Sequence, residues 1–256
     1  MKGFHAVIPA RYESTRLPGK PLAGIAGRPM IRWVWERAVA SGAETVTVAT
    51  DHEAVAAACH AFGASVVMTD PGHASGTDRI AEVAGRAGWE DDVIVVNVQG
   101  DEPLIPPAVI RQVADLLLLH PQADMATLGT PIHDLAEYLA PDVVKLVAAG
   151  DGAALYFSRA PIPWHRDSAP AGPASQERFD SSVRHLGIYS YRVEALRRLA
   201  ARPPCRLEEI ERLEQLRALY MGLKIQTDIA VEVPPAGVDT PKDLERVNAL
   251  LAARPA

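Results

Sequence analysis

The sequence predicts an α/β protein with a doubly wound, mostly parallel β-sheet, and three observations support this prediction. Short β-branched runs alternate with alanine-rich stretches of helical spacing through the first half of the chain. The first run and the run at 92–98 are apolar on both faces, as is typical of strands in a sheet covered on both sides. Charged segments with glycine and proline directly follow these two strands, at the edge where open parallel sheets bind ligands.

Four strands and four helices are expected within residues 1–122. The strands are predicted at 4–8, 45–50, 64–68 and 92–98. The helices are predicted at 29–41, 52–62, 77–88 and 106–120. The last helix opens with proline, which is tolerated in the first helical turn. Strands and helices in this alternating order predict the doubly wound arrangement.

The pattern loosens from residue 123 onward. Strands are predicted at 124–129, 143–148, 153–157, 183–191 and 224–233, and helices at 193–201, 207–221 and 241–253. The segment 161–181 is rich in Pro, Gly, Ser and charge, and it is long for an idle connection, so we expect a lid or an interface arm there. We expect one domain over residues 1–256, with a smaller second portion at 123–256 that ends in a helix.

Composition argues against several classes of protein. With 256 residues, 48% hydrophobic and 23% charged, the chain fits a soluble globular protein with a substantial core. The formal net charge of −6 argues against a nucleic-acid binder, and no apolar run approaches the roughly 20 residues needed to span a membrane. Cys59 and Cys205 form no CxxC pair, and the first residues lack the pattern of a signal peptide, so we expect a cytoplasmic protein.

The segment PARYESTRLPGKPL at 9–22 follows the first strand and is strongly cationic. A dinucleotide-binding protein would have GxGxxG at this place. Here Arg11, Arg16 and Lys20 supply positive charge instead, and Gly19 lets the backbone approach a ligand closely. Guanidinium forks and a mobile ammonium suit the oxygens of a triphosphate. A solvated basic loop is the alternative.

Two further segments lie at the same edge of the predicted sheet. VVNVQGDEP at 95–103 brings Asp101 to the phosphate loop, where a carboxylate favours Mg²⁺ held between it and phosphate oxygens; an exposed turn is the alternative. HASGTDR at 73–79 places small residues and backbone N–H groups before a helix. These groups suit the binding of a nucleotide. The alternative is that Ser75 or Thr77 only caps the helix.

These segments resemble the 3-deoxy-manno-octulosonate cytidylyltransferase (CMP-KDO synthetase) family, and the resemblance covers nearly the whole chain. Further blocks follow in the family's order: ATDH at 49–52, HASGTDRIAE at 73–82, NVQGDEPLIP at 97–106, ALYFSRAPIPW at 154–164, RHLGIYSYR at 184–192, LEQLR at 213–217 and GVDTPKDLERV at 237–247. Residues 166–182 match no motif of the family, and nothing is inferred for them.

The resemblance implies a Rossmann-type nucleotidyltransferase fold and a cytoplasmic, homodimeric, Mg²⁺-dependent enzyme. Such an enzyme transfers CMP from CTP to 3-deoxy-D-manno-octulosonate (KDO) for lipopolysaccharide biosynthesis. CTP binding is implied for the half at 1–122, at Ala10, Arg11, Ser14, Arg16, Lys20, Ser75, Gly76, Arg79 and Asp101. Catalytic roles are implied for Arg16, Lys20, Asp101 and Asp239, with Asp101 and Asp239 as metal ligands. A cap of the last helix is the alternative role for Asp239.

The same resemblance implies that the portion at 123–256 binds the sugar and forms the dimer. Sugar contacts are implied for Gln99, Arg159, His185, Tyr189, Glu214 and Gln215. Arg159 would pair with the sugar's carboxylate. A core or sheet position is the alternative for His185, and an exposed helix charge is the alternative for Glu214.

Two other functions stay open at this point. One is a related enzyme for another acid sugar, such as a sialate cytidylyltransferase. The other is a catalytically silent, nucleotide-binding regulator on the same fold, against which a pair of metal-binding aspartates argues. The motifs HExxH, GxSxG and GxxxxGK[ST] are absent, so zinc, triad and P-loop chemistry are unsupported.

Overall fold

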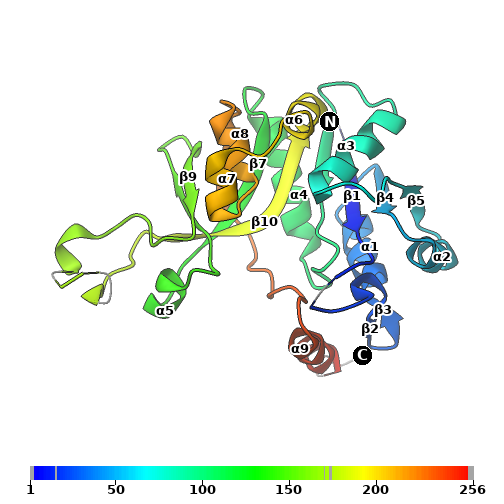
Figure 1. The fold of residues 1–256 in the computed structure, drawn as a ribbon, viewed down its shortest axis with the longest axis horizontal. Coiled ribbons are helices and arrows are strands. Elements are labelled where there is room, and N and C mark those ends of the chain that lie inside the picture. The colour runs from blue at the N-terminus through cyan, green and yellow to red at the C-terminus, as the bar shows by residue number, and fades with distance from the viewer. Residues whose placement is uncertain (1–2, 15, 170, 173–174, 253–256) are drawn as a thin grey trace.

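The computed structural model describes residues 3–14, 16–169, 171–172 and 175–252. Within them a nine-stranded mixed sheet has the order β11-β7-β10-β6-β1-β4-β5, and β8 and β9 branch from β10 (Figure 1). The first half of the chain supplies the parallel part, in which β1 pairs with β4 and β6, and β4 pairs with β5. The predicted α/β class with a mostly parallel sheet is confirmed.

All eight elements predicted in the first half are present. The strands are β1 (His5–Ala10), β4 (Thr45–Thr50), β5 (Ser65–Met68) and β6 (Ile94–Asn97). The helices are α1 (Met30–Ala40), α2 (Glu53–Ala61), α3 (Gly76–Arg86) and α4 (Pro107–Leu119). The structure adds the short helix η1 (Lys20–Leu22) and the two-residue strands β2 (Gly24–Ile25) and β3 (Arg28–Pro29). These short elements have too few residues to show a period in the sequence.

The two faces of β1 are covered by different helices. Ile8 belongs to the same buried cluster as Val34 of α1 and Ile110 of α4. The neighbouring Val7 belongs to a second cluster, with residues of α3 and α6. Successive strand residues point to opposite faces, so a strand with helices on both sides is apolar throughout. The doubly wound arrangement therefore follows from the apolar run that begins the chain.

The second half supplies five strands and five helices among the described residues. The strands are β7 (Met125–Pro131), β8 (Lys145–Ala148), β9 (Ala154–Ser158), β10 (Val183–Arg192) and β11 (Ile225–Ile229). The α-helices are α5 (Leu135–Leu139), α6 (Val193–Ala200), α7 (Arg206–Glu211), α8 (Gln215–Tyr220) and α9 (Pro241–Ala252), and a 3₁₀ turn, η2, spans Arg166–Ser168. β10 lies antiparallel between β6 and β7, and β11 is parallel to β7.

The single helix predicted at 207–221 is wrong. Arg212 adopts the left-handed conformation (φ 54°) and ends α7, and α8 begins three residues later. The break lets Leu213 and Leu216 turn into the core while Ile210 of α7 remains exposed. One straight helix could not place these leucines inside and still follow the path of α7. The strand predicted at 224–233 is also shorter, because pairing with β7 ends at Ile229.

A lateral arm formed by α5, the β8–β9 hairpin and the described part of 159–182 extends to one side of the molecule (Figure 1). The sequence predicted a lid or an interface arm at 161–181, and the described residues there lie in this projection. None of the helices in the described residues has the length and apolar character needed to cross a membrane.

Candidate active site

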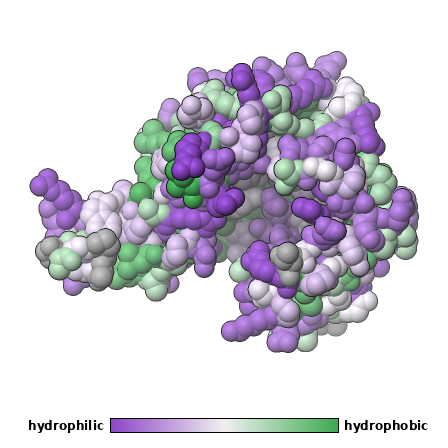
Figure 2. Space-filling view, in the orientation of Figure 1, coloured by the Kyte–Doolittle hydropathy of each residue, from purple (hydrophilic) through white to green (hydrophobic). Residues whose placement is uncertain are grey.

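Among the cavities at the edge where β1 and β6 end, two hold the predicted site residues of different kinds. The first, of about 680 Å³, is lined by residues 9–14, 16 and 18–21 of the cationic loop together with Gln99, Gly100, Asp101 and Asp239. The second, of about 360 Å³, lies over β10 and is lined by Gln99, Asp142, Val143, Val144, Arg184, His185, Gly187, Tyr189, Leu213 and Gln215. Gln99 lines both cavities. The space-filling view shows this face hollowed at its centre, with hydrophilic residues around the hollow (Figure 2).

Close backbone approach brings the segments of the first cavity together. A Cβ at Gly100 would lie 2.7 Å from the carbonyl oxygen of Pro9, so only glycine fits where β6 passes the end of β1. A Cβ at Gly237 would lie 3.1 Å from the carbonyl oxygen of Asp101. Val238 donates its backbone N–H to that oxygen at 2.8 Å. The segment before α9 is thereby fixed on Asp101, which delivers Asp239 to the cavity.

Lys20 joins the two aspartates of the first cavity. Its Nζ donates to Asp101 Oδ2 at 2.6 Å and to Asp239 Oδ1 at 2.8 Å. Arg16 Nη2 also lies 3.0 Å from Asp239 Oδ1. Burial opposes the charge of the ammonium, but both carboxylates favour it, and the pKa of Lys20 is raised above its ordinary value. Three residues predicted as catalytic therefore converge on one point, and Arg16 reaches it from the loop.

The cap of α9 is made by other residues, not by the Asp239 side chain. Thr240 Oγ1 accepts from the N–H of Asp243, and Asp243 Oδ2 accepts from the N–H groups of Asp239 and Thr240. This reciprocal pattern is a capping box. The alternative assigned to Asp239, a helix cap, is therefore wrong, and its carboxylate is directed at Lys20 and Arg16 instead.

The donor set at this point fits a magnesium ion. Two carboxylate oxygens, from Asp101 and Asp239, converge within hydrogen-bond distance of one cationic atom. Mg²⁺ prefers one or two carboxylates, with the remaining positions filled by water and substrate phosphates. The described residues contain no cluster of three or more His, Cys, Asp or Glu side chains that could hold a metal ion by themselves. Burial, followed by the charge of Asp101, raises the pKa of the adjacent Glu102 to about 7.

The remaining loop residues predicted to bind CTP also line the first cavity. Arg11 is half exposed, with its Nη2 only 3.6 Å from Glu13 Oε2. Ser14 Oγ accepts from the backbone N–H of Leu17 at 3.4 Å, which steadies the turn. Ala10 accepts a hydrogen bond from Thr50 through its carbonyl. The guanidinium of Arg11 is thus free to meet an anion at small cost, because exposed ion pairs contribute little.

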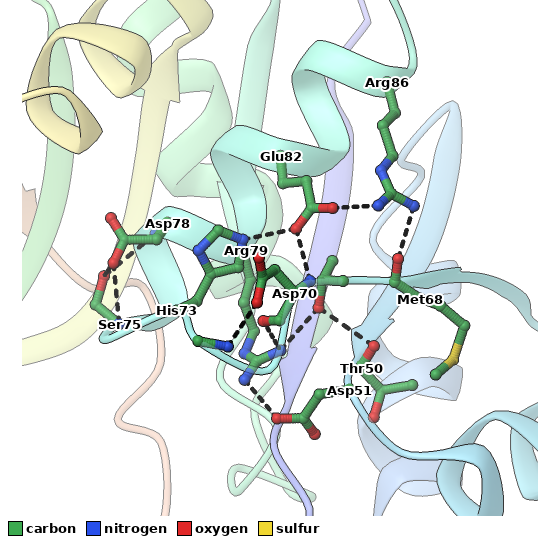
Figure 3. Close-up of polar contacts among 12 residues, drawn as sticks. Thr50, Asp51, Met68, Asp70, His73, Ser75, Asp78, Arg79, Glu82 and Arg86 are labelled. Atoms are coloured by element: carbon green, nitrogen blue, oxygen red, sulfur yellow. Dashed lines mark hydrogen bonds and ion pairs between the residues drawn. The ribbon is translucent and has the colours of Figure 1, made fainter.

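The segment 73–79 takes a supporting position beside the first cavity. Ser75 caps α3 in a capping box with Asp78, which confirms the cap that the sequence offered as an alternative. A Cβ at Gly76 would lie 3.3 Å from the Pro9 side chain, so α3 starts in close contact with the end of β1. Arg79 is 2% exposed and donates to Asp51 and Thr69 (Figure 3). None of these residues is among those that line the first cavity.

The second cavity brings together four of the six predicted sugar-binding residues: Gln99, His185, Tyr189 and Gln215. Burial lowers the pKa of His185 to about 3, so its ring is neutral. The Tyr189 hydroxyl is buried and has no hydrogen-bond partner among the described residues. Its pKa is raised well above the ordinary value by burial. A buried hydroxyl without a partner costs free energy that a polar ligand would restore.

The other two predicted sugar-binding residues lie outside the lining of this cavity. Arg159 donates to the carbonyl oxygens of Glu211 and Pro141. Glu214 accepts a hydrogen bond from Thr77 and lies 3.2 Å from Arg217 Nη2. Arg184 does line the cavity, although sequence reasoning did not select it. Its position next to His185 in RHLGIYSYR was the available signal.

A cationic loop at the end of β1, two facing carboxylates and an adjacent polar cavity define a nucleotide-binding α/β enzyme of the nucleotidyltransferase class. Residues 5–225 match the family model described as cytidylyltransferase. The curated 3-deoxy-manno-octulosonate cytidylyltransferase of Vibrio vulnificus (strain CMCP6) is 55% identical over 98% of this chain and 99% of that protein. The 3-deoxy-manno-octulosonate cytidylyltransferase of Pseudomonas syringae pv. syringae is also 54% identical, over 97% of this chain and 98% of that protein. The chain belongs to the 3-deoxy-manno-octulosonate cytidylyltransferase family.

Solved structures agree with this assignment. The structure of CMP:2-keto-3-deoxy-manno-octonic acid synthetase complexed with CTP is 43% identical, with a TM-score of 0.87 over 98% of this chain and 99% of that chain. A nucleotidyl transferase from Methanothermobacter thermautotroptrophicus shares the fold at 16% identity and a TM-score of 0.62, over 98% of each chain.

Proposed function

We propose that this protein transfers CMP from CTP to KDO, forming CMP-KDO and pyrophosphate. The observation that carries the proposal is that two unlike cavities share Gln99. The first offers cationic side chains to a triphosphate, with carboxylates beside them, and the second is lined mainly by neutral polar and apolar residues. The family relatives are described by this activity. A substrate with many hydroxyl groups needs donors and acceptors more than charge.

Positioning and charge neutralisation account for the reaction. The anomeric hydroxyl of KDO attacks the α-phosphorus of CTP, the new P–O bond forms, and the bond to pyrophosphate breaks in line with it. Arg11, Arg16 and Lys20 hold the phosphates, and their contacts strengthen as negative charge builds on the departing group. A covalent enzyme intermediate is not required.

Magnesium dependence is a further part of the proposal. Asp101 and Asp239 would hold the ion. Bound Mg²⁺ would neutralise charge on the phosphate oxygens. Lys20 holds the two carboxylates on one point of the cavity, and so keeps them arranged toward the ion and the substrate.

The neutral groups of the second cavity would recognise the hydroxyl groups of the sugar. Thr127 Oγ1 lies 2.7 Å from the carbonyl of Ile188 and 2.9 Å from His185 Nε2. Since the hydroxyl has one proton, donation to the carbonyl leaves it to accept from His185 Nε2–H, and His185 Nδ1 is then the acceptor atom of the ring. Tyr189 would supply its unpaired hydroxyl in the same cavity.

Two arginines compete for the sugar's carboxylate. Arg159 is the sequence-based choice, and Arg184 is the arginine that lines the cavity, with its Nη1 2.8 Å from Glu137 Oε1. Arg159→Ala and Arg184→Gln should be compared by steady-state kinetics with each substrate varied. The residue that binds the carboxylate is the one whose loss raises the KM for KDO and leaves that for CTP unchanged.

The decisive experiment is pyrophosphate release with CTP, Mg²⁺ and KDO, against mixtures that lack each component in turn. N-acetylneuraminate in place of KDO tests the sialate alternative. Release that needs all three components is the expected result. Pyrophosphate release with CTP and the sialate, but not with CTP and KDO, would overturn the sugar assignment. Binding of CTP without pyrophosphate release in any mixture would favour the silent regulator.

We further propose that the enzyme works as a cytoplasmic homodimer supplying lipopolysaccharide synthesis, with the lateral arm as the interface. The arm exposes Leu155 of β9 (60%) and Trp164 (41%), large apolar side chains that a partner subunit would cover. Light scattering should give a molar mass twice that of one chain. The Trp164→Glu variant should have a mass closer to that of one chain. A monomer at micromolar concentration would contradict the dimer.

A further inference from the structure

We propose that Asp51 and Arg79 are positioning residues that hold the triphosphate loop through Tyr12. The inference rests on the proposed function, because it assigns a task to side chains outside the lining of the CTP cavity. It replaces the direct CTP contact that the sequence implied for Arg79.

Arg79 is buried and forms its hydrogen bonds inside the protein. It leaves the first turn of α3, its Nη2 contacts Asp51 Oδ2 at 2.6 Å, and its Nη1 donates to Thr69 Oγ1 at 2.8 Å (Figure 3). The side chains of Arg79 and Asp51 are 2% and 11% exposed. A buried guanidinium paired in this way is not available to a ligand in the first cavity, but it fixes the carboxylate of Asp51 in place.

The segment at the end of β4 holds the start of the cationic loop at three points. Thr50 Oγ1 donates to the carbonyl of Ala10 at 2.7 Å. The backbone N–H of Tyr12 donates to Asp51 Oδ1 at 3.5 Å. The ring of Tyr12 stacks on His52, with centroids 3.8 Å apart and planes at 12°. Arg79 holds one oxygen of Asp51, and the loop takes the other.

Tyr12 connects Asp51 to the phosphate-binding turn at Gly19 and Lys20. Gly19 is in the left-handed conformation (φ 65°), and a Cβ there would lie 3.6 Å from the Tyr12 ring. Lys20 follows directly, with its ammonium on both aspartates. Hydrogen bonds therefore connect Arg79 to Asp51 and Asp51 to Tyr12, and the ring of Tyr12 lies beside the turn at Gly19 that precedes Lys20. Small displacements of such a loop matter, because positioning errors near 1 Å cost large factors in binding and rate.

CTP affinity is the direct test, measured by calorimetry with Mg²⁺ and without KDO. Asp51→Asn keeps the size of the side chain and removes its charge, and it should weaken CTP binding by roughly tenfold while the KM for KDO stays unchanged. His52→Asn removes the stacking partner of Tyr12 but keeps a helix-capping acceptor, since His52 Nδ1 accepts from Ala54. His52→Asn should weaken CTP binding about threefold. This variant still tests the inference if Asp51→Asn does not fold.

Arg86→Gln is the matched control. Arg86 is on the same helix and pairs with Glu82, but it is 56% exposed, and it forms no hydrogen bond or ion pair with the described residues of the loop at 9–22 (Figure 3). CTP affinity should remain that of the unaltered protein. A lower melting temperature with unchanged CTP affinity in both Asp51→Asn and His52→Asn would overturn the inference, since the pair would then hold only the fold.

The proposed function fails by a different readout. If the unaltered protein binds CTP but releases no pyrophosphate with KDO, the sugar assignment is lost while the loop inference stands on the affinities of the variants. If the unaltered protein has no affinity for CTP, both are overturned.

Discussion

The two cavities that share Gln99 differ in how they present charge. In the first, three ion pairs join Arg16 to Asp239 and Lys20 to both Asp101 and Asp239. In the second, His185 is neutral and the unpaired group is the hydroxyl of Tyr189. The first cavity therefore depends on matched charges, and the second on hydrogen bonds with little net charge.

This difference separates the effects expected of substitutions. Loss of a charge in the first cavity leaves its opposite unmatched and should affect phosphate chemistry strongly. Loss of a neutral donor in the second cavity should modestly weaken the binding of one substrate. Four experiments test whether the two cavities divide in this way.

The largest effect is expected for Asp101→Asn and Asp239→Asn. Each removes a negative charge that a hard cation needs, and we expect activity to fall roughly 10²–10³-fold. Melting should stay near that of the unaltered protein, because the capping box of Thr240 and Asp243 remains. Asp243→Asn is the control: it should lower the melting temperature and retain most activity. Full activity of Asp239→Asn at limiting Mg²⁺ would remove the metal role.

Arg16→Ala should come next, with kcat/KM lowered about ten- to a hundredfold. The guanidinium is 64% exposed, so its loss should scarcely change stability, while a charged hydrogen bond to phosphate contributes about 1.5–3 kcal/mol. Arg32→Ala, on the outer surface of α1, is the control and should behave as the unaltered enzyme. An Arg16→Ala enzyme with unaltered kinetics would exclude the phosphate contact.

Tyr189→Phe tests the neutral cavity. It removes one hydroxyl worth about 0.5–1.5 kcal/mol when hydrogen-bonded, so the KM for KDO should rise about three- to tenfold. The KM for CTP should not change. The protein should be as stable as before or more so, because an unpaired buried hydroxyl is removed. A raised KM for CTP would show that the two cavities do not divide the substrates. Tyr220→Phe, on the exposed end of α8, is the control.

The last prediction concerns the pH dependence of stability. His185 has a pKa of about 3 in the folded protein, below the ordinary value of 6.5, so the unfolded chain binds its proton first. The contribution of neutral His185 to the free energy of unfolding is complete above pH 6.5. It is lost as the pH falls toward 3, by at most about 1.4 kcal/mol per pH unit. His185→Gln should flatten that loss in urea unfolding between pH 6.5 and 4.5. Equal slopes for both proteins would contradict a neutral His185.

The sequence allowed the parallel half to be predicted because its central strands β1 and β6 are buried on both faces, and continuous apolar runs such as 92–98 leave little ambiguity. The second half depends on features with no local signal. The turn at Arg212 is set by which leucines reach the core, and the antiparallel placement of β10 is set by tertiary pairing.

The same contrast holds within the site. Lys20, Asp101 and Asp239 could be selected from charge at strand ends and from resemblance, and the structure brings them together. That Arg79 is buried against Asp51 could not be read from the sequence, since an arginine in the first turn of a helix looks the same whether it faces a ligand or the interior. Arg184 could not be preferred to Arg159 from the sequence, because tertiary pairing of β10 with β8 is what places it in the second cavity.

The hydrogen bond from Val238 to Asp101 has a consequence for synthesis of the chain. Asp239 is 219 residues from Lys20 in sequence, and it reaches the cavity only through this late segment. Chains emerge from the ribosome with the N-terminal part first. The sheet around β1 and β6 can therefore form while the cavity still lacks one of its two carboxylates. Catalytic competence is therefore gained only after residue 239 has been made, so a chain that ended before it would keep a phosphate-binding loop without the means to use it.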